Sequence, residues 1–369
     1  FLPNLKKVKF TSELLKRSLK LTVSNAGVRS VDKKGSFDEF LKSVKNKNLS
    51  PRLRKLKKNL LITGGSGFLG VNLALSLKKK YNVYIGSRNQ KRNYDASLET
   101  GCESIPIDVT NIESVRDALI YSKPDTIIHG AATKFVDISE KFPFECSDVN
   151  ILGSTNIARV AIERGVKTVI GISTDKATQP IKNFYGFSKA TMEKLFLNAN
   201  GNSKTNFLCV RYGNVAWSTG SVLPIWKQMF EKDKKILTTG PFMRRFFFTI
   251  DDAVELVLFA LKESKKFRGK ILCADMKACK LIDIIKVWNQ NFGGSYKIIK
   301  ERKGDRLDEY LIGENEIKFT TKIHNKKKIF YLIDLEKKSL KPLKKIVSSE
   351  NASRLNKSEI YNLLKLGLN

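Results

Sequence analysis

The stretch LLITGGSGFLG at residues 60–70 decides the fold of this chain. Its apolar start is typical of a buried parallel strand, and a helical pattern begins at Phe68. Gly64 allows a tight turn, Gly67 lets the backbone approach a pyrophosphate, and Gly70 lets the helix pack closely on the strand. A glycine-rich turn without a ligand is the alternative, but the strand before it and the helix after it favour a dinucleotide site at a helix N-terminus.

Strand and helix patterns alternate from residue 59 onward. The predicted strands are 59–62, 82–86, 104–107, 125–129, 167–172 and 206–211. The predicted helices between them are 68–80, 111–121, 149–164 and 185–199. This alternation predicts right-handed crossovers and therefore an α/β fold with a doubly wound, Rossmann-like parallel sheet.

The domain organisation follows from where this alternation starts and where it loosens. We predict a basic N-terminal extension at 1–58, a nucleotide-binding domain at 59–215, a smaller substrate-binding region at 216–313 that could interleave with it, and a basic C-terminal tail at 314–369. The later helices are expected at 221–232, 251–263, 281–291 and 357–366, with short strands at 270–273 and 296–300.

The composition favours a globular protein in a reducing compartment. Of the 369 residues, 41% are hydrophobic, and no run of about 18 apolar residues predicts a membrane span. The five cysteines are scattered and lack the spacing of a zinc site, so they predict neither a metal nor a disulfide framework. A cytoplasmic protein is the resulting expectation.

The net charge of +32 allows two interpretations. Residues 1–58 hold 17 Lys and Arg but only four Asp and Glu. A lysine-rich solvated surface is one interpretation, and a footprint for nucleic acid or another anionic surface is the other. We favour the first, because acids interleave with the bases along the chain and no RNA-binding signature is present.

The first 31 residues have a pattern of their own. Glu13 is their only acid, and the apolar residues from Leu5 to Leu21 have a partly helical spacing. An ordinary basic helix would show this pattern, and so would the remnant of an organellar targeting segment. In the second case we would expect the protein in an organelle matrix.

The residues that follow the second predicted strand indicate the cofactor. A site for NAD usually has Asp or Glu here, to bind the ribose 2′-hydroxyl. This chain has Ser87 and Arg88 instead, which suit the 2′-phosphate of NADP, although an exposed loop arginine is the alternative. Asp108, before Val109, could accept a hydrogen bond from the adenine amine or serve as an acid at a helix N-terminus.

Two pairs of side chains predict acid–base chemistry. Tyr185 and Lys189 share one face at the start of a helix. An ammonium group lowers the pKa of a nearby phenol, and the phenolate can accept a hydroxyl proton while hydride moves to nicotinamide. Asp175 and Lys176 follow a strand at the sheet edge where ligands bind, and could form a second acid–base pair. A surface coincidence and a loop ion pair are the respective alternatives.

Longer motifs carry a resemblance to a known family. They are HGAATKFV from residue 129, DVNILGSTNIARVA from 148, STDKATQP from 173, YGFSKATMEKL from 185, RYGNVAWSTGSVLP from 211, MRRFFFT from 243 and ERKGDRLDEYLI from 301. Over about 59–313 the chain resembles the extended short-chain dehydrogenase/reductases. The similarity is closest to their polysaccharide-biosynthesis branch, which contains the inverting UDP-N-acetylglucosamine 4,6-dehydratases.

The resemblance implies a lyase that removes water from a UDP-sugar by internal hydride transfer, with NADP that is never released. Tyr185, assisted by Lys189, would take the C4 hydroxyl proton, and Thr174 would hold the C4 oxygen. Lys176 would take the C5 proton, and Asp175 would protonate the departing 6-hydroxyl. Hydride would then return to C6, with inversion at C5.

The resemblance also implies a set of binding residues and an oligomer of identical chains. The cofactor residues would be Gly64, Gly67, Phe68, Leu69, Gly70, Ser87, Arg88, Asp108, Val109, Ala131, Ala132, Lys134, Asn150, Tyr185 and Lys189. The substrate residues would be Lys134, Asn214, Arg245 and Arg302. Guanidinium groups suit a diphosphate because they bind it in bidentate fashion, whereas surface ion pairing is the alternative.

Two departures from the family pattern bear on the substrate. One extra residue lies between Lys176 and Tyr185, so that either the loop bulges or Lys176 is displaced, and Arg244 stands where the family usually has a small hydroxyl residue. A nucleotide-sugar epimerase of the same family is one alternative, although inversion at C4 does not need Asp175 and Lys176. The high net charge suggests the other, a non-catalytic subunit of an RNA-containing or organellar assembly.

Overall fold

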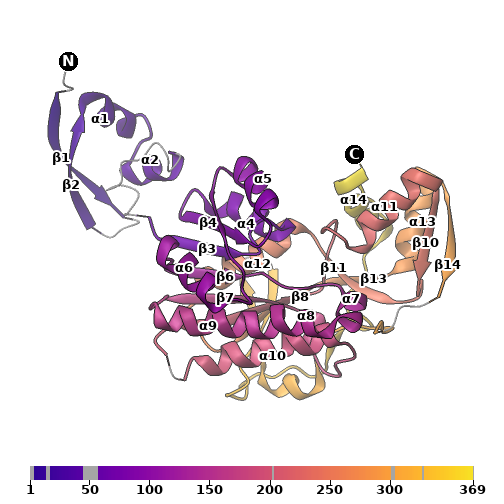
Figure 1. Cartoon of the computed structure of the whole chain (residues 1–369). Helices are drawn as coiled ribbons and strands as arrows, with labels where there is room; N and C mark the ends of the chain where they lie inside the picture. The colour runs from indigo at the N-terminus through magenta and orange to yellow at the C-terminus, as the bar shows by residue number, and fades with distance from the viewer. Residues whose placement is uncertain are drawn as a thin grey trace.

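The computed structural model describes residues 4–13, 17–44, 57–201, 203–300, 304–325 and 328–368. Figure 1 shows a large sheet between two layers of helices, a second group of helices and small sheets around α11 and α13, and a small N-terminal unit. The large sheet carries the site, and the second group closes over one end of it.

Among the described residues, the main sheet has nine strands in the order β16-β17-β12-β8-β7-β6-β3-β4-β5. Their bounds are Asn59–Thr63 (β3), Asn82–Ser87 (β4), Glu103–Pro106 (β5), Thr126–His129 (β6), Thr168–Thr174 (β7), Asn206–Tyr212 (β8), Ile271–Ala274 (β12), Thr320–Asn325 (β16) and Lys328–Ile333 (β17). The strands from β12 to β5 are parallel, whereas β17 and β16 add an antiparallel edge. The order reverses between β3 and β6, which confirms the predicted doubly wound fold and places the ligand-binding crevice there.

Helices cover both faces of this sheet. One layer consists of α4 (Phe68–Leu77), α5 (Gln90–Thr100) and α12 (Ile250–Lys262), and the other of α6 (Ile112–Ser122), α9 (Gly153–Glu163) and α10 (Phe184–Ala199). The short helices α7 (Val136–Lys141) and α8 (Pro143–Ser147) and a π-helical turn at Asp148–Leu152 precede α9. The sequence patterns predicted five of these six long helices near their observed bounds, and α5 is the one that they missed.

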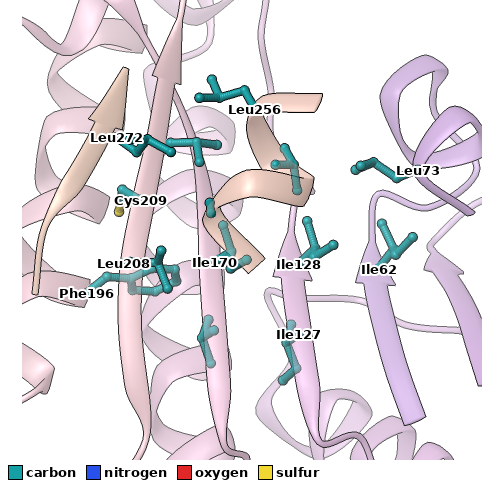
Figure 2. Close-up of a cluster of buried hydrophobic side chains, with 14 of the residues drawn as sticks. Ile62, Leu73, Ile127, Ile128, Ile170, Phe196, Leu208, Cys209, Leu256 and Leu272 are labelled. Atoms are coloured by element: carbon teal, nitrogen blue, oxygen red, sulfur yellow. The ribbon is translucent and has the colours of Figure 1, made fainter. Parts of the chain in front are cut away.

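The core between the layers is built from aliphatic strand residues that face both helix layers. Ile62, Ile128 and Ile170 lie on adjacent strands and are at most 1% exposed. Figure 2 shows Leu73 of α4 and Leu256 of α12 packed near these strands, and Phe196 of α10 beside Leu208. Strands that are buried on both faces need such continuous apolar runs, which is why these segments were recognisable in the sequence.

A second core holds the region that follows β8. It contains the three-stranded sheet of β9 (Asn214–Val215), β11 (Arg244–Phe248) and β13 (Lys277–Lys280), and the parallel pair of β10 (Lys235–Thr239) and β14 (Ser295–Ile299). Helices α11 (Val222–Asp233), α13 (Leu281–Phe292) and α14 (Lys357–Leu368) pack around Trp226 and Trp288. β15 (Tyr310–Ile312) pairs with β18 (Val347–Ser348), flanked by 3₁₀ turns at Asp175–Ala177 and Glu314–Phe319.

The main sheet is not confined to one of the predicted segments. Strand β12 comes from the predicted substrate-binding region, and β16 and β17 come from the predicted tail, yet all three extend the sheet. The end of the tail, α14, packs in the second core instead. The divisions expected at residues 215 and 313 therefore run through segments that share one sheet.

The N-terminal segment has a different structure from the one its spacing suggested. The expectation of a partly helical pattern from Leu5 to Leu21 is wrong, because β1 (Leu5–Ser12) and β2 (Arg17–Ser24) form an antiparallel hairpin. Phe10 and Leu21 are buried against α1 (Asn25–Asp32) and α2 (Phe37–Ser43), and the rings of Phe10 and Phe37 stack at 5.0 Å. The alternation of apolar and basic residues along β1 is the period of a strand. Residues 1–3, 14–16 and 45–56 of the expected basic extension lie outside the described residues.

Within the described ranges, none of the helices has the length and apolar character needed to cross a membrane. The five cysteines are all buried thiols. Nowhere in the same ranges do three or more His, Cys, Asp or Glu side chains converge in a way that could hold a metal ion.

Gly70→Ala is expected to destabilise the protein. A Cβ at this position would lie 2.6 Å from the carbonyl oxygen of Gly64 and from the backbone of Gly65, and neither can move without disturbing the turn. We expect a loss of about 2 kcal/mol in the free energy of unfolding, more than the roughly 1 kcal/mol that alanine contributes to a helix. Urea unfolding measures the change.

Gly201→Ala is the matched control, because its added Cβ would make only an ordinary contact of 3.6 Å. A Gly70→Ala variant as stable as Gly201→Ala would show that helix α4 does not need this close approach.

Candidate active site

A cavity of about 1230 Å³ opens at the carboxyl ends of the parallel strands. Its wall is formed at one end by the glycine turn after β3 and the residues after β4, and at the other end by the segment 213–222 and Arg245. Thr174, Lys176, Tyr185 and Lys189 line the middle. The cavity therefore has the length and the placement to hold a dinucleotide and a second ligand in line.

The glycine turn has the geometry that its sequence predicted. Gly64 has a φ of +69°, and a Cβ there would lie 2.9 Å from the backbone of Gly130 and Ala131. Gly67 is the N-cap of α4, with no side chain to occupy the first N–H groups of the helix. These N–H groups and the positive end of the helix dipole face the cavity, where they suit a diphosphate.

The residues after β4 form a polar end of the cavity. The Ser87 hydroxyl donates to Asn93 Oδ1 at 2.6 Å and lies 2.7 Å from the Ser66 hydroxyl. Arg88 is about half exposed and lies 3.9 Å from a Glu145 carboxylate oxygen. Arg92 lines the same end, and sequence reasoning did not single it out. Its signal was its place four residues after Arg88, in the first turn of α5.

The other predicted cofactor residues fall into two groups. Phe68, Leu69, Val109, Ala131, Ala132 and Lys134 line the cavity. Asp108 and Asn150 are absent from the wall: Asp108 accepts hydrogen bonds from the backbone and hydroxyl of Thr110. The Asn150 side chain bonds to both backbone groups of Thr133 and to Ser188 Oγ. Asn150 thus fixes the cavity loop onto helix α10 without facing the cavity.

Lys189 is buried, whereas Tyr185 is partly exposed at the cavity wall. Asn183 caps α10 by accepting from Gly186 N–H at 2.8 Å, which sets Tyr185 in the first turn. Burial raises the pKa of Tyr185 to about 12, against the opposing effects of the Lys176 ammonium and a hydrogen bond with Thr174. The expected lowering of this pKa by Lys189 is not found, because desolvation outweighs the neighbouring cations.

The Lys189 ammonium is itself destabilised. Its nitrogen lies 3.1 Å from the Met192 sulfur, which is a weak acceptor, and burial lowers its pKa to about 8. The lysine therefore changes its charge near physiological pH, within the same cavity as Tyr185.

Lys176 lies between two carboxylates and an amide. Its nitrogen is 3.1 Å from Asp175 Oδ1, 3.3 Å from Glu309 Oε1 and 3.5 Å from Asn214 Oδ1. Burial alone would lower its pKa, but Asp175 and Glu309 outweigh burial and raise it. Lys176 is thus an ammonium in the protein alone, with its end in the cavity wall.

Asp175 lies behind this wall. Its side chain is fully buried, and burial raises its pKa in spite of Lys176. Thr174 Oγ donates to Asp175 Oδ1 at 2.9 Å, whereas Oδ2 has no hydrogen-bond partner within the described part of the chain. Because its pKa is raised and the Lys176 ammonium lies beside it, the Asp175 carboxylate can accept a proton from Lys176.

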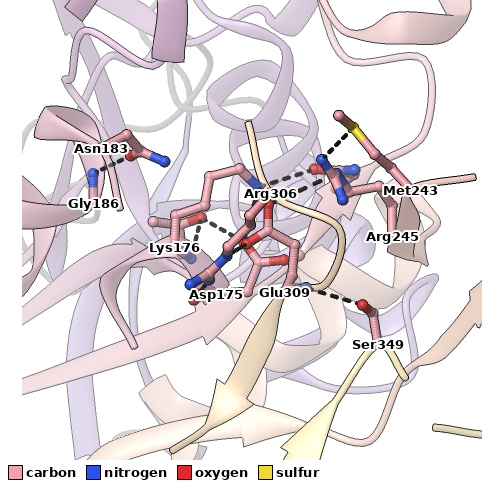
Figure 3. Close-up of polar contacts among 12 residues, drawn as sticks. Asp175, Lys176, Asn183, Gly186, Met243, Arg245, Arg306, Glu309 and Ser349 are labelled. Carbon is pink, nitrogen blue, oxygen red and sulfur yellow. Dashed lines mark hydrogen bonds and ion pairs between the residues drawn. The ribbon is translucent and has the colours of Figure 1, made fainter. Parts of the chain in front are cut away.

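Figure 3 shows the charged residues that surround this pair. Glu309 is buried, with Oε2 2.5 Å from Arg306 Nε and Oε1 3.7 Å from Arg245 Nε. Burial would raise the pKa of Glu309, but Lys176, Arg245 and Arg306 together lower it. Sequence reasoning did not identify Glu309, although it lies in the motif from residue 301, because its partners are remote in the chain.

The loop between Lys176 and Tyr185 is held closely at both ends. The chain returns so near to its start that a Cβ on Gly186 would lie 2.3 Å from the Lys176 carbonyl oxygen. Arg306 donates to the Pro180 carbonyl and Asn183 to that of Gly304. The effect of the extra residue on Lys176 stays a prediction.

The predicted substrate residues are partly brought together. Asn214 and Arg245 line the cavity wall near Lys176. Arg245 also donates to the carbonyls of Arg244 and Leu307, which fixes its guanidinium plane. Arg302 lies outside the described residues. Arg244 points elsewhere, into an ion pair with Asp308 and Glu350.

Comparisons with known proteins agree with this geometry. The sequence profile of a family described as "Polysaccharide biosynthesis protein" matches residues 60–331. The inverting UDP-N-acetylglucosamine 4,6-dehydratase of Campylobacter jejuni is 35% identical over 73% of this chain and 81% of its own length. A UDP-glucose 4-epimerase of Rickettsia bellii is 34% identical over 83% of this chain and 95% of its own.

One solved structure covers nearly all of the same region. Pen from Bacillus thuringiensis superposes with a TM-score of 0.77 at 28% identity, over 85% of this chain and 98% of its own. The family match at residues 60–331 includes the segments that supply the glycine turn, Lys176 and Tyr185.

Lys189→Met is expected to stabilise the protein at neutral pH. The pKa of Lys189 falls from 10.5 in the unfolded chain to about 8 in the folded one, so its burial costs most below pH 8 and this cost is relieved as the pH rises toward 10.5. We expect a gain of about 2 kcal/mol at pH 7 that shrinks toward pH 10. Urea unfolding at pH 7 and pH 9.5 measures both.

Lys194→Met is the control, on the exposed face of the same helix. Lys194→Met should change the free energy of unfolding by the same amount at pH 7 and at pH 9.5. If the effect of Lys189→Met is also the same at both pH values, the pKa of Lys189 is not lowered.

Proposed function

The chain belongs to the polysaccharide biosynthesis protein family, a branch of the extended short-chain dehydrogenase/reductases, and we propose that it is an NADP-dependent nucleotide-sugar 4,6-dehydratase. UDP-N-acetylglucosamine is the proposed substrate and inversion at C5 the proposed outcome. Membership alone supports an enzyme that acts on nucleotide sugars, because relatives of this chain are named both as dehydratases and as epimerases.

The cavity fits a nicotinamide dinucleotide. The turn is too closely packed for a Cβ at Gly64 or Gly70, and with Gly67 as N-cap the first N–H groups of α4 have no side-chain cap and lie at the cavity, as a diphosphate site requires. At the far end, Ser87, Arg88 and Arg92 offer hydroxyl and guanidinium donors for a 2′-phosphate. Tyr185 and Lys189 would flank the nicotinamide ribose, and the bound nicotinamide would supply a reversible hydride acceptor.

One observation carries the choice of a dehydratase over an epimerase: Asp175 and Lys176 form a second acid–base pair beside Tyr185. The Lys176 nitrogen lies 3.1 Å from Asp175 Oδ1, and Lys176 lines the same cavity as Tyr185. Inversion at C4 needs only one proton acceptor. Removal of water across C5 and C6 needs a base for C5–H and an acid for the departing oxygen.

In the proposed reaction, Tyr185 takes the C4 hydroxyl proton as the C4 hydrogen leaves as hydride. The chain stabilises the phenolate through the Lys176 ammonium, which lowers the pKa of Tyr185. The resulting 4-ketone makes C5–H acidic.

Asp175 and Lys176 then exchange a proton, and the pair returns to its starting charges once water has been removed. Lys176 first passes a proton to Asp175, which leaves a neutral amine and a neutral carboxylic acid. The amine takes the C5 proton, and the carboxylic acid protonates the departing 6-hydroxyl. Because Asp175 lies behind the wall, the hydroxyl of Thr174, which is bonded to it and lines the cavity, is the proposed carrier of this proton. The hydride taken from C4 then returns to C6, a proton from solvent adds to C5 on the opposite face, and Tyr185 releases its proton to solvent.

Arg245 and Asn214 are the proposed anchors of the UDP part. Arg245 lines the cavity with a guanidinium plane fixed by two carbonyls, which suits a diphosphate. A homo-oligomer and the assignment of Arg302 stay predictions.

Proton NMR of the purified protein with UDP-N-acetylglucosamine in deuterated water tests the function. A new C6 methyl signal with deuterium at C5 is the expected result. Loss of the C5–H signal without a methyl group, or formation of a 4-epimer, would instead support an epimerase like the Rickettsia relative.

Lys176→Ala is expected to abolish deuterium exchange at C5 and methyl formation, with a loss of about 100-fold or more, because the base is removed. The cofactor should remain bound, since Lys176 is remote from the glycine turn. Cofactor content by absorbance and exchange by NMR are the two measurements. Lys182→Ala, in the exposed loop beside it, is the control. Exchange near the wild-type rate in Lys176→Ala would remove Lys176 from its role.

Arg88→Asp is expected to weaken the preference for NADP over NAD by about 10-fold or more, because a carboxylate repels the 2′-phosphate and accepts from a 2′-hydroxyl. The ratio of the two dissociation constants, measured by calorimetry on the protein freed of cofactor, reports the change. Arg159→Asp alters charge equally on an exposed helix position outside the cavity. If both variants keep the wild-type ratio, Arg88 does not bind the phosphate.

A further inference from the structure

Glu309 is a buried carboxylate shared by three cations. Oε1 lies 3.3 Å from Lys176 Nζ and 3.7 Å from Arg245 Nε, and Oε2 lies 2.5 Å from Arg306 Nε. Its side chain is 3% exposed, so water does not screen these charges. Figure 3 shows the carboxylate between Arg306, Arg245 and the Asp175–Lys176 pair.

The C-terminal region fixes this carboxylate. The backbone N–H of Glu309 donates to Ser349 Oγ at 2.9 Å, and the Ser349 N–H donates to the Glu309 carbonyl at 2.8 Å. Ser349 Oγ in turn donates to Asp308 Oδ1 at 2.9 Å. Ser349 lies beyond residue 331, where the family profile ends.

We propose that Glu309, anchored by Ser349, is a positioning residue that keeps Lys176 in its charged form and holds its nitrogen toward Asp175 until substrate binds. This deepens the proposed function, since it concerns the same lysine. The groups that face Lys176 are Asp175, Glu309, Asn214, Arg245 and Tyr185. Asp175 exchanges the proton, and Glu309 is the only other carboxylate that the described residues place on Lys176.

The reason lies in the balance of charge. Glu309 stays ionised because three cations surround it, so it stabilises the ammonium form of Lys176 in its place beside Asp175 without taking its proton. An anionic diphosphate at Arg245 competes with Glu309 for that guanidinium. The same carboxylate therefore links the substrate anchor to the base.

Trace acetylation of the whole protein with acetic anhydride at pH 8, read by mass spectrometry, tests the proposal. Only the neutral amine reacts, so its rate rises about tenfold for each unit by which the pKa falls. Loss of an opposite charge within about 4–6 Å shifts a pKa by one unit or more. We expect Glu309→Gln to raise the acetylation of Lys176, relative to Lys189 in the same sample, by about tenfold.

Lys189 is the internal reference because it lines the same cavity and Glu309 is not among the groups that act on it. Glu350→Gln is the matched control, since Glu350 pairs with Arg244 and is 65% exposed. The proposal would be overturned if Glu309→Gln raised the acetylation of Lys176 relative to Lys189 by less than about threefold, or if Glu350→Gln raised it as much. A purely structural role would open the cavity and raise both lysines together.

Ser349→Ala takes the place of Glu309→Gln if that variant does not fold. It loosens the anchor of Glu309 and keeps its charge, so a rise in the same direction of about threefold is expected, and no rise would count against the proposal. The labelling needs no sugar nucleotide and no turnover. Failure of this inference is therefore distinguishable from failure of the proposed dehydratase activity, which the NMR assay reports separately.

Discussion

Buried charge is the constraint on which the site depends. An isolated ion in a protein interior is costly, so Asp175, Lys176, Arg245, Arg306 and Glu309 persist there only because each has an opposite charge beside it. Asp175 and Lys176 follow the end of β7, and Arg245 lies in β11. Arg306 and Glu309 lie in the segment before β15. The requirement to pair them ties these distant segments into one wall.

The same constraint explains why the segment 304–325 packs against the main sheet. Arg211 of β8 is fully enclosed and pairs with Glu193 of α10 at 2.7 Å and with Glu316 at 2.9 Å. Together with β12, β16 and β17, this cluster holds the segment 304–325 against the sheet. The wall that carries Glu309 therefore rests on the same scaffold as the cofactor cradle, as a site that must keep sub-ångström geometry requires.

The sequence predicted best where one local rule decides the structure. The turn after β3 needs glycine at a φ of +69° and at a close helix contact, so Gly64 and Gly70 were recognisable alone. The buried strands were recognisable from apolar runs. The hairpin of β1 and β2 was missed, because its short apolar alternation amid lysines matches a helical spacing nearly as well. The stacking of Phe10 on Phe37, which fixes this segment as a strand packed on α2, is a tertiary contact.

By itself, the sequence determined the doubly wound α/β fold and the glycine turn, and it was enough to single out the four side chains of the two proposed acid–base pairs, because each is encoded within a few neighbouring residues. The tertiary structure alone decided the charge states: burial raises the pKa of Tyr185 to about 12 and lowers that of Lys189 to about 8. It also decided that Asp175 lies behind the wall and that Glu309 meets Lys176. Solvent exclusion and contacts between residues more than a hundred positions apart cannot be read from local spacing, since they exist only when the chain is packed.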